Sequence, residues 1–135
     1  MNEFRRFREQ PHTRAQGSVA EQAAAQWLEG QGFRILDTNV RNPAGELDIV
    51  ALEGDTLCYI EVKARANPAF GRAIEAVDWK KRRRLMRAAA LDLAHRRHEG
   101  PCRFDVLGLD PGENGWHAEL VRNAFEMDPR AFRGR

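Results

Sequence analysis

Apolar and polar positions alternate most clearly in two neighbouring β-type segments, residues 45–53 and 56–63. A Gly-Asp pair separates them, and such a pair between two β-type segments is typical of a two-residue hairpin turn. With this turn, the segments form adjacent antiparallel strands in which Asp48 lies directly opposite Glu61. The pattern therefore predicts a hairpin that brings two acidic side chains together, in a register that a slip of one residue would undo.

Alternation also predicts how the hairpin divides between its two faces. One face is wholly apolar, whereas the other is apolar near the turn and charged at its far end. The apolar face is expected to contain Leu47, Ile49, Ala51, Cys58, Ile60 and Val62. The mixed face is expected to contain Glu46, Asp48, Val50, Leu52, Leu57, Tyr59, Glu61 and Lys63. The charged end of the mixed face is where we expect a functional site.

A helix is predicted from Ser18 to Leu28, because a Ser-x-x-Glu capping box that ends at Glu21 is followed by an alanine-rich segment. Gly30 and Gly32 are expected to end this helix. Its buried stripe is expected to contain Val19, Ala23 and Trp27, together with Ala20 and Ala24.

A second helix is predicted over residues 77–95, with Gly100-Pro101 as its stop. Its sheet-facing side is expected to contain Val77, Leu85, Ala88, Ala89 and Leu93. The remaining segments are predicted as strands at residues 33–36, 103–109 and 116–121, a turn at residues 42–45 and a loop at residues 64–75. The second helix separates the strand after it from the hairpin, so this strand can run parallel to its neighbour, and the last strand lies at a sheet edge. This order of elements predicts an α/β fold.

The composition is that of one globular domain. The chain has 135 residues, of which 42% are hydrophobic and 31% are charged. It contains no apolar segment of the roughly 20 residues that a membrane span needs, so a cytoplasmic location is expected. We expect a mobile basic arm at residues 1–16, a domain at residues 17–122 and a tail at residues 123–135. Cys58 and Cys102 are expected to be reduced and structural.

The net charge of +2 conceals a strongly basic segment in the second predicted helix. Within residues 80–97, Asp92 is the one acid, and the basic residues are Lys80, Lys81, Arg82, Arg83, Arg84, Arg87, Arg96 and Arg97. Positive charge concentrated on one element can attract the phosphates of a nucleic acid. The alternative is that these side chains only form a solvated helix face.

The predicted apposition of Asp48 and Glu61 suggests metal chemistry. Like charges directly opposite each other on two strands destabilise the sheet. A divalent cation between the two carboxylates would replace repulsion with ligation, and Mg²⁺ prefers carboxylate oxygen. Lys63 points to the same side and could hold a phosphate or activate a water molecule. The alternative is that all three are solvated residues on an exposed sheet face.

An ordered set of motifs resembles a known group of nucleases. Glu21 on a helix, then Leu47-Asp48, then Glu61-Val62-Lys63 on the next strand resemble the PD-(D/E)XK superfamily, although Leu47 stands where the superfamily label has proline. Residues 17–109 resemble more closely the small YraN-like family of predicted nucleases, although Ala20 stands where this family usually has glycine. The residues that carry this resemblance are Gly17 with Glu21, Gly32, Asn39, Arg41, Gly45-Glu46-Leu47-Asp48, Glu61-Val62-Lys63, Phe70-Gly71, Val77 with Lys81, and Arg103-Phe104-Asp105-Val106.

The resemblance implies a restriction-endonuclease-like fold, which is a three-layer core with a mixed central sheet flanked by helices. It implies that Asp48 and Glu61 bind Mg²⁺, for which Mn²⁺ can substitute, and that the backbone carbonyl of Val62 completes the inner coordination shell. It also implies that Lys63 assists the attacking water. In some branches of the superfamily, a glutamate on the first helix is a further ligand or organises the metal site. The resemblance implies this role for Glu21. The alternative is that Glu21 only belongs to the capping box.

By this resemblance, residues 17–122 are expected to form a nuclease-like domain that hydrolyses phosphodiester bonds of DNA, with branched, repair or recombination intermediates as candidate substrates. Contacts with the nucleic acid are expected from Lys80, Lys81, Arg82, Arg83, Arg84, Arg41 and Arg65. A junction resolvase needs two sites and hence a homodimer, for which the edge of the last strand could supply the interface. The alternative is a non-catalytic nucleic-acid-binding domain with the same fold.

Three further residues have open interpretations. Glu46 shares the predicted face of Asp48 and is expected to form a salt bridge with Lys63. Lys81 lies on the sheet-facing side of the second helix, so it either supports the site or extends along the helix edge into solvent. Asp105 is a candidate partner for that helix.

Overall fold

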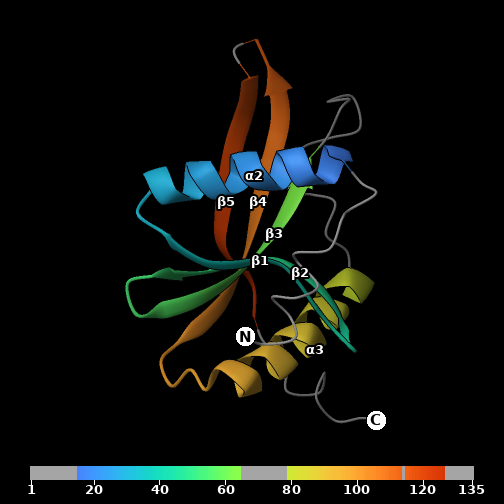
Figure 1. Ribbon diagram of the computed structural model, residues 1–135, viewed down its shortest axis with the longest axis vertical. Helices are drawn as coiled ribbons and strands as arrows, with labels where there is room; N and C mark the ends of the chain where they lie inside the picture. Colours follow the sequence, from blue (N-terminus) through green and yellow to red (C-terminus); the bar gives the residue numbers. More distant parts are fainter. Residues whose placement is uncertain (1–14, 65–78, 114, 127–135) are drawn as a thin grey trace.

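The computed structural model describes residues 15–64, 79–113 and 115–126 (Figure 1). Within these ranges the chain has the predicted order of a helix, three strands, a helix and two strands. The elements are α2 (Ala15–Gly30), β1 (Arg34–Asn42), β2 (Gly45–Glu53), β3 (Thr56–Ala64), α3 (Trp79–Arg96), β4 (Cys102–Gly112) and β5 (Gly115–Phe125). Most of the expected arm, loop and tail lies outside the described residues, as do Arg65 and Val77.

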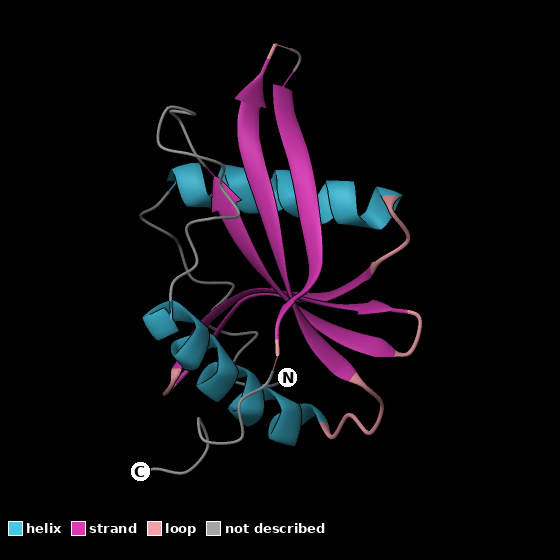
Figure 2. Cartoon of the chain, turned by 180° about the vertical axis from the view of Figure 1, so that it is seen from behind, coloured by secondary structure: helices cyan, strands magenta, loops and turns pink. Residues whose placement is uncertain are grey.

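The strands form one mixed sheet in the order β1-β2-β3-β4-β5. All neighbouring strands are antiparallel except β3 and β4, which run parallel, as the long connection that contains α3 predicts. The last strand, β5, lies at an edge, which confirms its predicted place. Figure 1 shows α2 in front of β3, β4 and β5, and Figure 2 shows these strands in front of α2 when the molecule is seen from behind.

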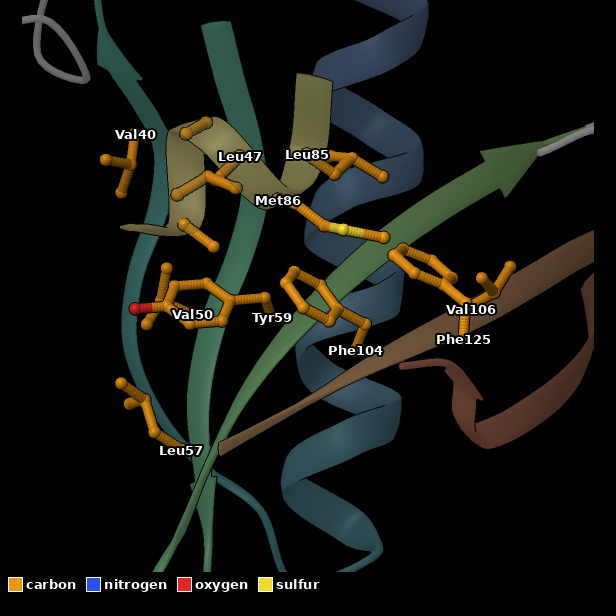
Figure 3. Packing of buried hydrophobic residues seen from close by; sticks show 12 residues of the cluster. Val40, Leu47, Val50, Leu57, Tyr59, Leu85, Met86, Phe104, Val106 and Phe125 are labelled. Atoms are coloured by element: carbon orange, nitrogen blue, oxygen red, sulfur yellow. The ribbon is translucent and has the colours of Figure 1, made fainter. Parts of the chain in front are cut away.

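Each helix packs on its own hydrophobic cluster of the sheet. The cluster under α2 contains Ala20, Ala24, Leu28, Phe33, Ile49, Ala51, Cys58, Ile60, Leu107 and Leu109. The cluster under α3 contains Val40, Leu47, Val50, Leu57, Tyr59, Leu85, Met86, Ala88, Ala89, Phe104, Val106 and Phe125. In the second cluster Phe104 lies between Tyr59 and Phe125, with its ring centroid 4.8 Å from the stacked ring of Phe125 (Figure 3). Two apolar faces of one sheet thus each require a helix to cover them.

The hairpin register is confirmed from the turn as far as the pair Ile49–Ile60. Its side chains alternate between the two clusters as predicted, with one exception. Leu47 packs with Val50 in the cluster under α3, whereas alternation places it with Ile49 under α2. The neighbouring residue of β1, Asn39, has a φ of 52°, and this left-handed conformation interrupts the regular pleat at the same point.

The first helix begins earlier than predicted, and the structure confirms Ala20 and Ala24 of the expected buried stripe but not Val19. It begins at Ala15, so Ser18 lies inside the helix and the capping-box interpretation is wrong. Val19 is 56% exposed, whereas Ala20, Ala24 and Leu28 are buried. These three residues recur every four positions, and Ala23 and Trp27 are half-buried at the edge of their cluster, so the buried stripe centres on Ala20, Ala24 and Leu28. The small alanine side chains let the helix backbone approach the sheet closely.

β1, β4 and β5 are longer than predicted, because pairing with a neighbouring strand extends each of them. β1 continues through residues 37–42, which were expected to form a connection, because these residues pair with β2. β5 continues to Phe125, three residues into the expected tail. Phe125 is buried and stacks on Phe104, so the end of this strand belongs to the core. α3 ends at Arg96, followed by Arg97 with a φ of 59°, upstream of the predicted Gly100-Pro101 stop.

Both cysteines are free. Burial raises the pKa of the Cys58 thiol to about 12, which keeps it protonated and unreactive at neutral pH. Neither helix in the described ranges is long and apolar enough to cross a membrane.

Candidate functional site

The sheet forks between β2 and β3 (Figure 1). From the pair Ile49–Ile60 to the hairpin turn, the two strands pair with each other. Beyond this pair, β2 remains paired with β1 as far as Gly45, whereas β3 remains paired with β4 as far as Ala64. The facing backbone edges of β2 and β3 are therefore outside the ladder in the fork. Asp48 and Glu61 are the first residues beyond the last pair, so the fork opens at the two predicted acids.

Asp48 connects the two branches of the fork. Its Oδ2 accepts a hydrogen bond of 2.9 Å from the backbone N–H of Val62 in β3. A buried N–H group that has no partner in a ladder needs another acceptor, and the carboxyl group supplies one. The motifs implied a role for the carbonyl of Val62 and gave no sign of this contact through its N–H. The contact depends on the fork, which forms because β2 stays paired with β1 while β3 stays paired with β4.

The carboxyl groups of Asp48 and Glu61 lie together, as the predicted register requires. Burial is the largest cause that raises the pKa of Asp48 well above its ordinary value, followed by the negative charge of Glu61, while the hydrogen bond from Val62 opposes the rise. A side-chain hydrogen bond with Glu61 raises the pKa of Asp48 further. Oxygens at hydrogen-bonding distance are also close enough for one cation to contact both.

Two lysines neutralise Glu61. The Nζ atom of Lys81 in α3 lies 3.1 Å from Glu61 Oε2, and the Nζ atom of Lys63 lies 3.7 Å from the same oxygen. The Glu61 side chain is only 5% exposed, and a buried carboxylate needs such partners. Lys81 thus lies beside the acids, with 37% of its side chain exposed, and its support of a functional site stays a prediction. Its place one turn before buried Leu85 was the sequence signal.

Glu21 lies near enough to Asp48 for its charge to contribute to the raised pKa of Asp48, after the larger effects of burial and Glu61. The structure thus brings α2 towards the same acids. In the ranges that the structure describes, no group of three or more His, Cys, Asp or Glu side chains is arranged to hold a metal ion. The carboxyl pair itself comprises only Asp48 and Glu61, and the role of Glu21 as a ligand stays a prediction.

The basic residues of α3 do not all point to the acids. Lys80, Arg83, Arg84 and Arg87 are exposed, and their spacing of three and four residues places them on one side of the helix, opposite the side that packs on the sheet. Arg82 is half-buried, and its guanidinium carbon lies 5.4 Å from the ring centroid of Phe125. The predicted nucleic-acid contacts on α3 therefore divide into Lys81 at the acids, Arg82 at the core and an outward stripe.

Two expected partners differ in the structure. Glu46 was expected to pair with Lys63, but its Oε2 lies 3.2 Å from Arg41 Nε on the neighbouring strand β1. Asp105 was considered as a partner for α3, but it accepts hydrogen bonds from Arg103 and from the backbone N–H of Asn123. Glu46 lies beside Arg41 because these two residues are paired in the β1–β2 ladder. Asp105 receives the Asn123 N–H at an irregularity in the β4–β5 register.

A surface hollow of about 510 Å³ lies away from the acids. Its lining residues are Leu36, Leu52, Leu57, Arg96, Arg97, His98 and Glu99. Within it, the Arg96 guanidinium is directed to Asp92, with Nε 2.7 Å from Asp92 Oδ2. The Oδ2 of Asp92 also accepts a 2.9 Å hydrogen bond from Tyr59, so this buried acid has a structural role between α3 and the sheet.

The relatives of this chain share most of its length. The model of the family described as "Uncharacterised protein family UPF0102" matches residues 20–109, which include Asp48, Glu61, Lys63 and Lys81. The chain is 44% identical over 115 residues to a UPF0102 protein of Symbiobacterium thermophilum, covering 84% of this chain and 98% of that protein. It is 43% identical over 117 residues to a UPF0102 protein of Pseudomonas putida strain F1, covering 84% and 94%. It is 44% identical over 115 residues to a UPF0102 protein of Moorella thermoacetica, covering 83% and 96%. The chain therefore belongs to the protein family UPF0102, the YraN-like family that its motifs indicate.

Proposed function

We propose that this protein is a Mg²⁺-dependent nuclease that hydrolyses phosphodiester bonds of DNA. The observation that carries the proposal is that Asp48 and Glu61 lie together where the strands of the fork separate, with two lysine ammonium groups beside Glu61. Acids on a solvated sheet face would separate into water and keep ordinary pKa values. A carboxyl group with a raised pKa next to charged partners, such as Asp48, is instead a candidate for a functional site.

The arrangement also supports a restriction-endonuclease-like fold for the chain. A mixed sheet with one helix on each face, and with the acids on neighbouring strands, agrees with the fold that the motifs imply. The strand that carries Glu61 and Lys63, β3, is the one that pairs in parallel with β4. Fold alone does not establish an activity, so the proposal depends on the acids and lysines.

The side chains at the fork fit a divalent cation. Asp48 and Glu61 would hold the ion, with the carbonyl of Val62 as a further ligand and Glu21 as either a ligand or an organising acid. These are oxygen donors, which Mg²⁺ prefers. Mg²⁺ commonly uses one or two carboxylates, water molecules and substrate phosphates rather than a complete protein cage. A pair of carboxylates without a third acidic ligand is therefore sufficient.

When bound, the ion would stabilise negative charge on the scissile phosphate and lower the pKa of the attacking water. Lys63 would donate a hydrogen bond to this water or to a phosphate oxygen, because its ammonium group already lies 3.7 Å from Glu61. The outward stripe of α3 would contact phosphates elsewhere on the nucleic acid, since surface lysine and arginine side chains bind the backbone without reading sequence.

The activity can be tested with purified protein and DNA in Mg²⁺ or Mn²⁺. Labelled single-stranded, duplex, flapped and four-way branched DNA would be compared, and the products resolved on denaturing gels. Cleavage is expected for the wild-type protein and is expected to fall by at least about 100-fold with Asp48→Asn or Lys63→Ala, since each removes part of the proposed chemistry.

Asp55→Asn is the matched control, because it makes the same chemical change at an exposed position in the hairpin turn. It is expected to cleave like the wild-type protein. Cleavage that persists unchanged in Asp48→Asn or Lys63→Ala would show that another site or a contaminant is responsible, and it would end the assignment.

The second candidate is a nucleic-acid-binding domain that does not cleave, which the outward stripe of α3 favours. In this case DNA binding would weaken with rising salt as phosphate contacts are screened, but Asp48→Asn would leave binding intact and divalent cations would not be needed. Salt-dependent binding without cleavage of any tested DNA would therefore favour the second candidate over the first.

A further inference from the structure

Lys81 contacts one of the two acids between which a cation is expected. Its Nζ atom lies 3.1 Å from Glu61 Oε2, closer than the 3.7 Å of Lys63 Nζ to the same oxygen. Glu61 itself is buried, with 5% of its side chain exposed. Glu61 Oε2 is thus already in contact with two ammonium groups, although the proposed function assigns Glu61 to a metal ion.

The two lysines differ in how freely they can leave. Lys63 follows Glu61 on the same strand by two residues, so the strand holds both side chains on one side. Lys81 comes from a separate element, α3, and 37% of its side chain is exposed. A lysine has a flexible four-carbon chain that can carry its charge to a new partner without moving the backbone. Lys81 is therefore the partner of Glu61 that can move towards solvent.

We propose that Lys81 is an exchangeable counter-ion, which neutralises Glu61 in the metal-free protein, leaves it when a divalent cation binds, and then contacts a phosphate group of the substrate. This inference rests on the proposed function, because it needs a metal ion at Asp48 and Glu61. The reason for exchange is charge. Two ammonium groups and a divalent cation around one carboxylate repel one another, and the most mobile of the three relieves the repulsion by leaving.

The exchange couples metal binding to phosphate binding. A phosphate group that attracts Lys81 away from Glu61 removes a competitor of the metal ion, and a bound metal ion releases Lys81 for the phosphate. By thermodynamic linkage, each ligand must then strengthen the binding of the other by the same factor. The site would hold its metal ion most tightly when substrate is present.

Metal affinity tests the inference without measuring cleavage. Mn²⁺ binding would be followed by electron paramagnetic resonance for the wild-type protein and for Lys81→Met, Lys81→Gln and Lys81→Arg. The two neutral variants are expected to bind Mn²⁺ roughly threefold to tenfold more tightly, because the competing charge is gone. Lys81→Arg keeps the charge and is expected to bind Mn²⁺ like the wild-type protein.

Lys80→Met is the matched control, since it removes the same charge from the neighbouring, exposed position of α3. It is expected to leave Mn²⁺ affinity unchanged. Thermal melting followed by circular dichroism would confirm that each variant is folded. Lys81→Gln, which retains hydrogen-bond donors, provides a second neutral variant if Lys81→Met is unstable.

The same titrations in the presence of a dinucleotide with a phosphorothioate linkage test the second half of the inference. This probe is expected to tighten Mn²⁺ binding more in the wild-type protein than in Lys81→Met. If both neutral variants bind Mn²⁺ no more tightly than the wild-type protein, the exchange is overturned while the proposed function stands. If the wild-type protein binds no Mn²⁺, or if Glu61→Gln binds it equally well, the proposed metal site is overturned as well.

Discussion

Asp48 of β2 and Glu61 of β3 lie together at the fork of the sheet, where the charge of Glu61 adds to burial in raising the pKa of Asp48. The antiparallel ladder ends one residue before them, and the two acids then connect branches that follow different neighbours. Protonation of Asp48 removes the repulsion between its carboxylate and the negative charge of Glu61. The stability of the protein should therefore respond to pH and to divalent cations through this pair.

The pH dependence of stability follows from the raised pKa of Asp48. The folded protein holds this proton more tightly than the unfolded chain, in which aspartate titrates at about 4. The contribution of Asp48 to the free energy of unfolding is therefore largest below that pH and is lost as the pH rises towards the folded pKa. Urea denaturation of the metal-free protein from about pH 4 to neutrality would measure this loss.

Asp48→Asn is the control for this pH effect, because the amide has the shape of the acid and does not titrate. The stability difference between the wild-type protein and Asp48→Asn should shift in favour of the variant as the pH rises. Mg²⁺ should restore the stability of the wild-type protein but should not change that of the variant. A stability difference that is constant over this range would contradict the raised pKa of Asp48 in the folded protein.

Glu53 stabilises the other end of the hairpin. Hydrogen bonds from Arg122 first, and then from Arg103, lower the pKa of Glu53 to about 2. A lowered pKa gives stability that is present above the ordinary pKa of glutamate and is lost as the pH falls towards 2. Because Arg122 is 49% exposed and solvent screens the pair, Glu53→Gln should cost about 1 kcal/mol at neutral pH.

The cost of Glu53→Gln should shrink as the pH falls towards the folded pKa of about 2, which denaturation at pH 7 and at about pH 2 would measure. Glu29→Gln, at an exposed position near the end of α2, is the matched substitution and should cost little at either pH. A cost for Glu53→Gln that stays the same in acid would show that packing, and not charge, gives Glu53 its effect.

Phe125 should behave as a core residue. It is buried and stacks on Phe104 with the ring centroids 4.8 Å apart, although the sequence places it in a polar tail. Truncation of a buried aromatic side chain removes apolar contact and leaves a cavity, so Phe125→Ala should cost about 3 kcal/mol of unfolding free energy. Trp116→Ala, on the same strand but at a 43% exposed position, should cost far less. Equal costs, measured by urea denaturation, would place Phe125 outside the core.

The outward stripe of α3 should determine how DNA binding depends on salt. Each phosphate contact contributes about 0.9 to the slope of log affinity against log salt concentration for duplex DNA. Replacing Lys80, Arg83 and Arg84 together with glutamine should therefore reduce that slope by between about 2 and 3. Fluorescence anisotropy at several salt concentrations would measure it. Arg34→Gln, on the exposed part of β1, should leave the slope unchanged, and an unchanged slope in the triple variant would exclude this surface.

The hairpin and its acids could be predicted because they depend on local signals. A Gly-Asp pair between two alternating segments determines the turn, the turn determines the register, and the register brings Asp48 and Glu61 together. The order of elements likewise follows from periodicity and from the long helix before β4. These features need no knowledge of how distant segments pack.

The features that could not be predicted depend on distant packing. The fork exists because β2 follows β1 while β3 follows β4, and the bond from the Val62 N–H to Asp48 is a consequence of that choice. The contact of Lys81 with Glu61 needs the placement of α3 against the sheet. Phe125 joins the core because β5 stays paired with β4 as far as the pair Phe104–Phe125, beyond the apolar part of the β5 sequence.

A crystal structure of the protein soaked with Mn²⁺ tests the central claim most directly. The account predicts an anomalous density peak in the fork that contacts oxygen atoms of both Asp48 and Glu61, with the Lys81 ammonium group moved away from Glu61. Absence of a peak at that position, or a peak that contacts only one of the two acids, would contradict the account.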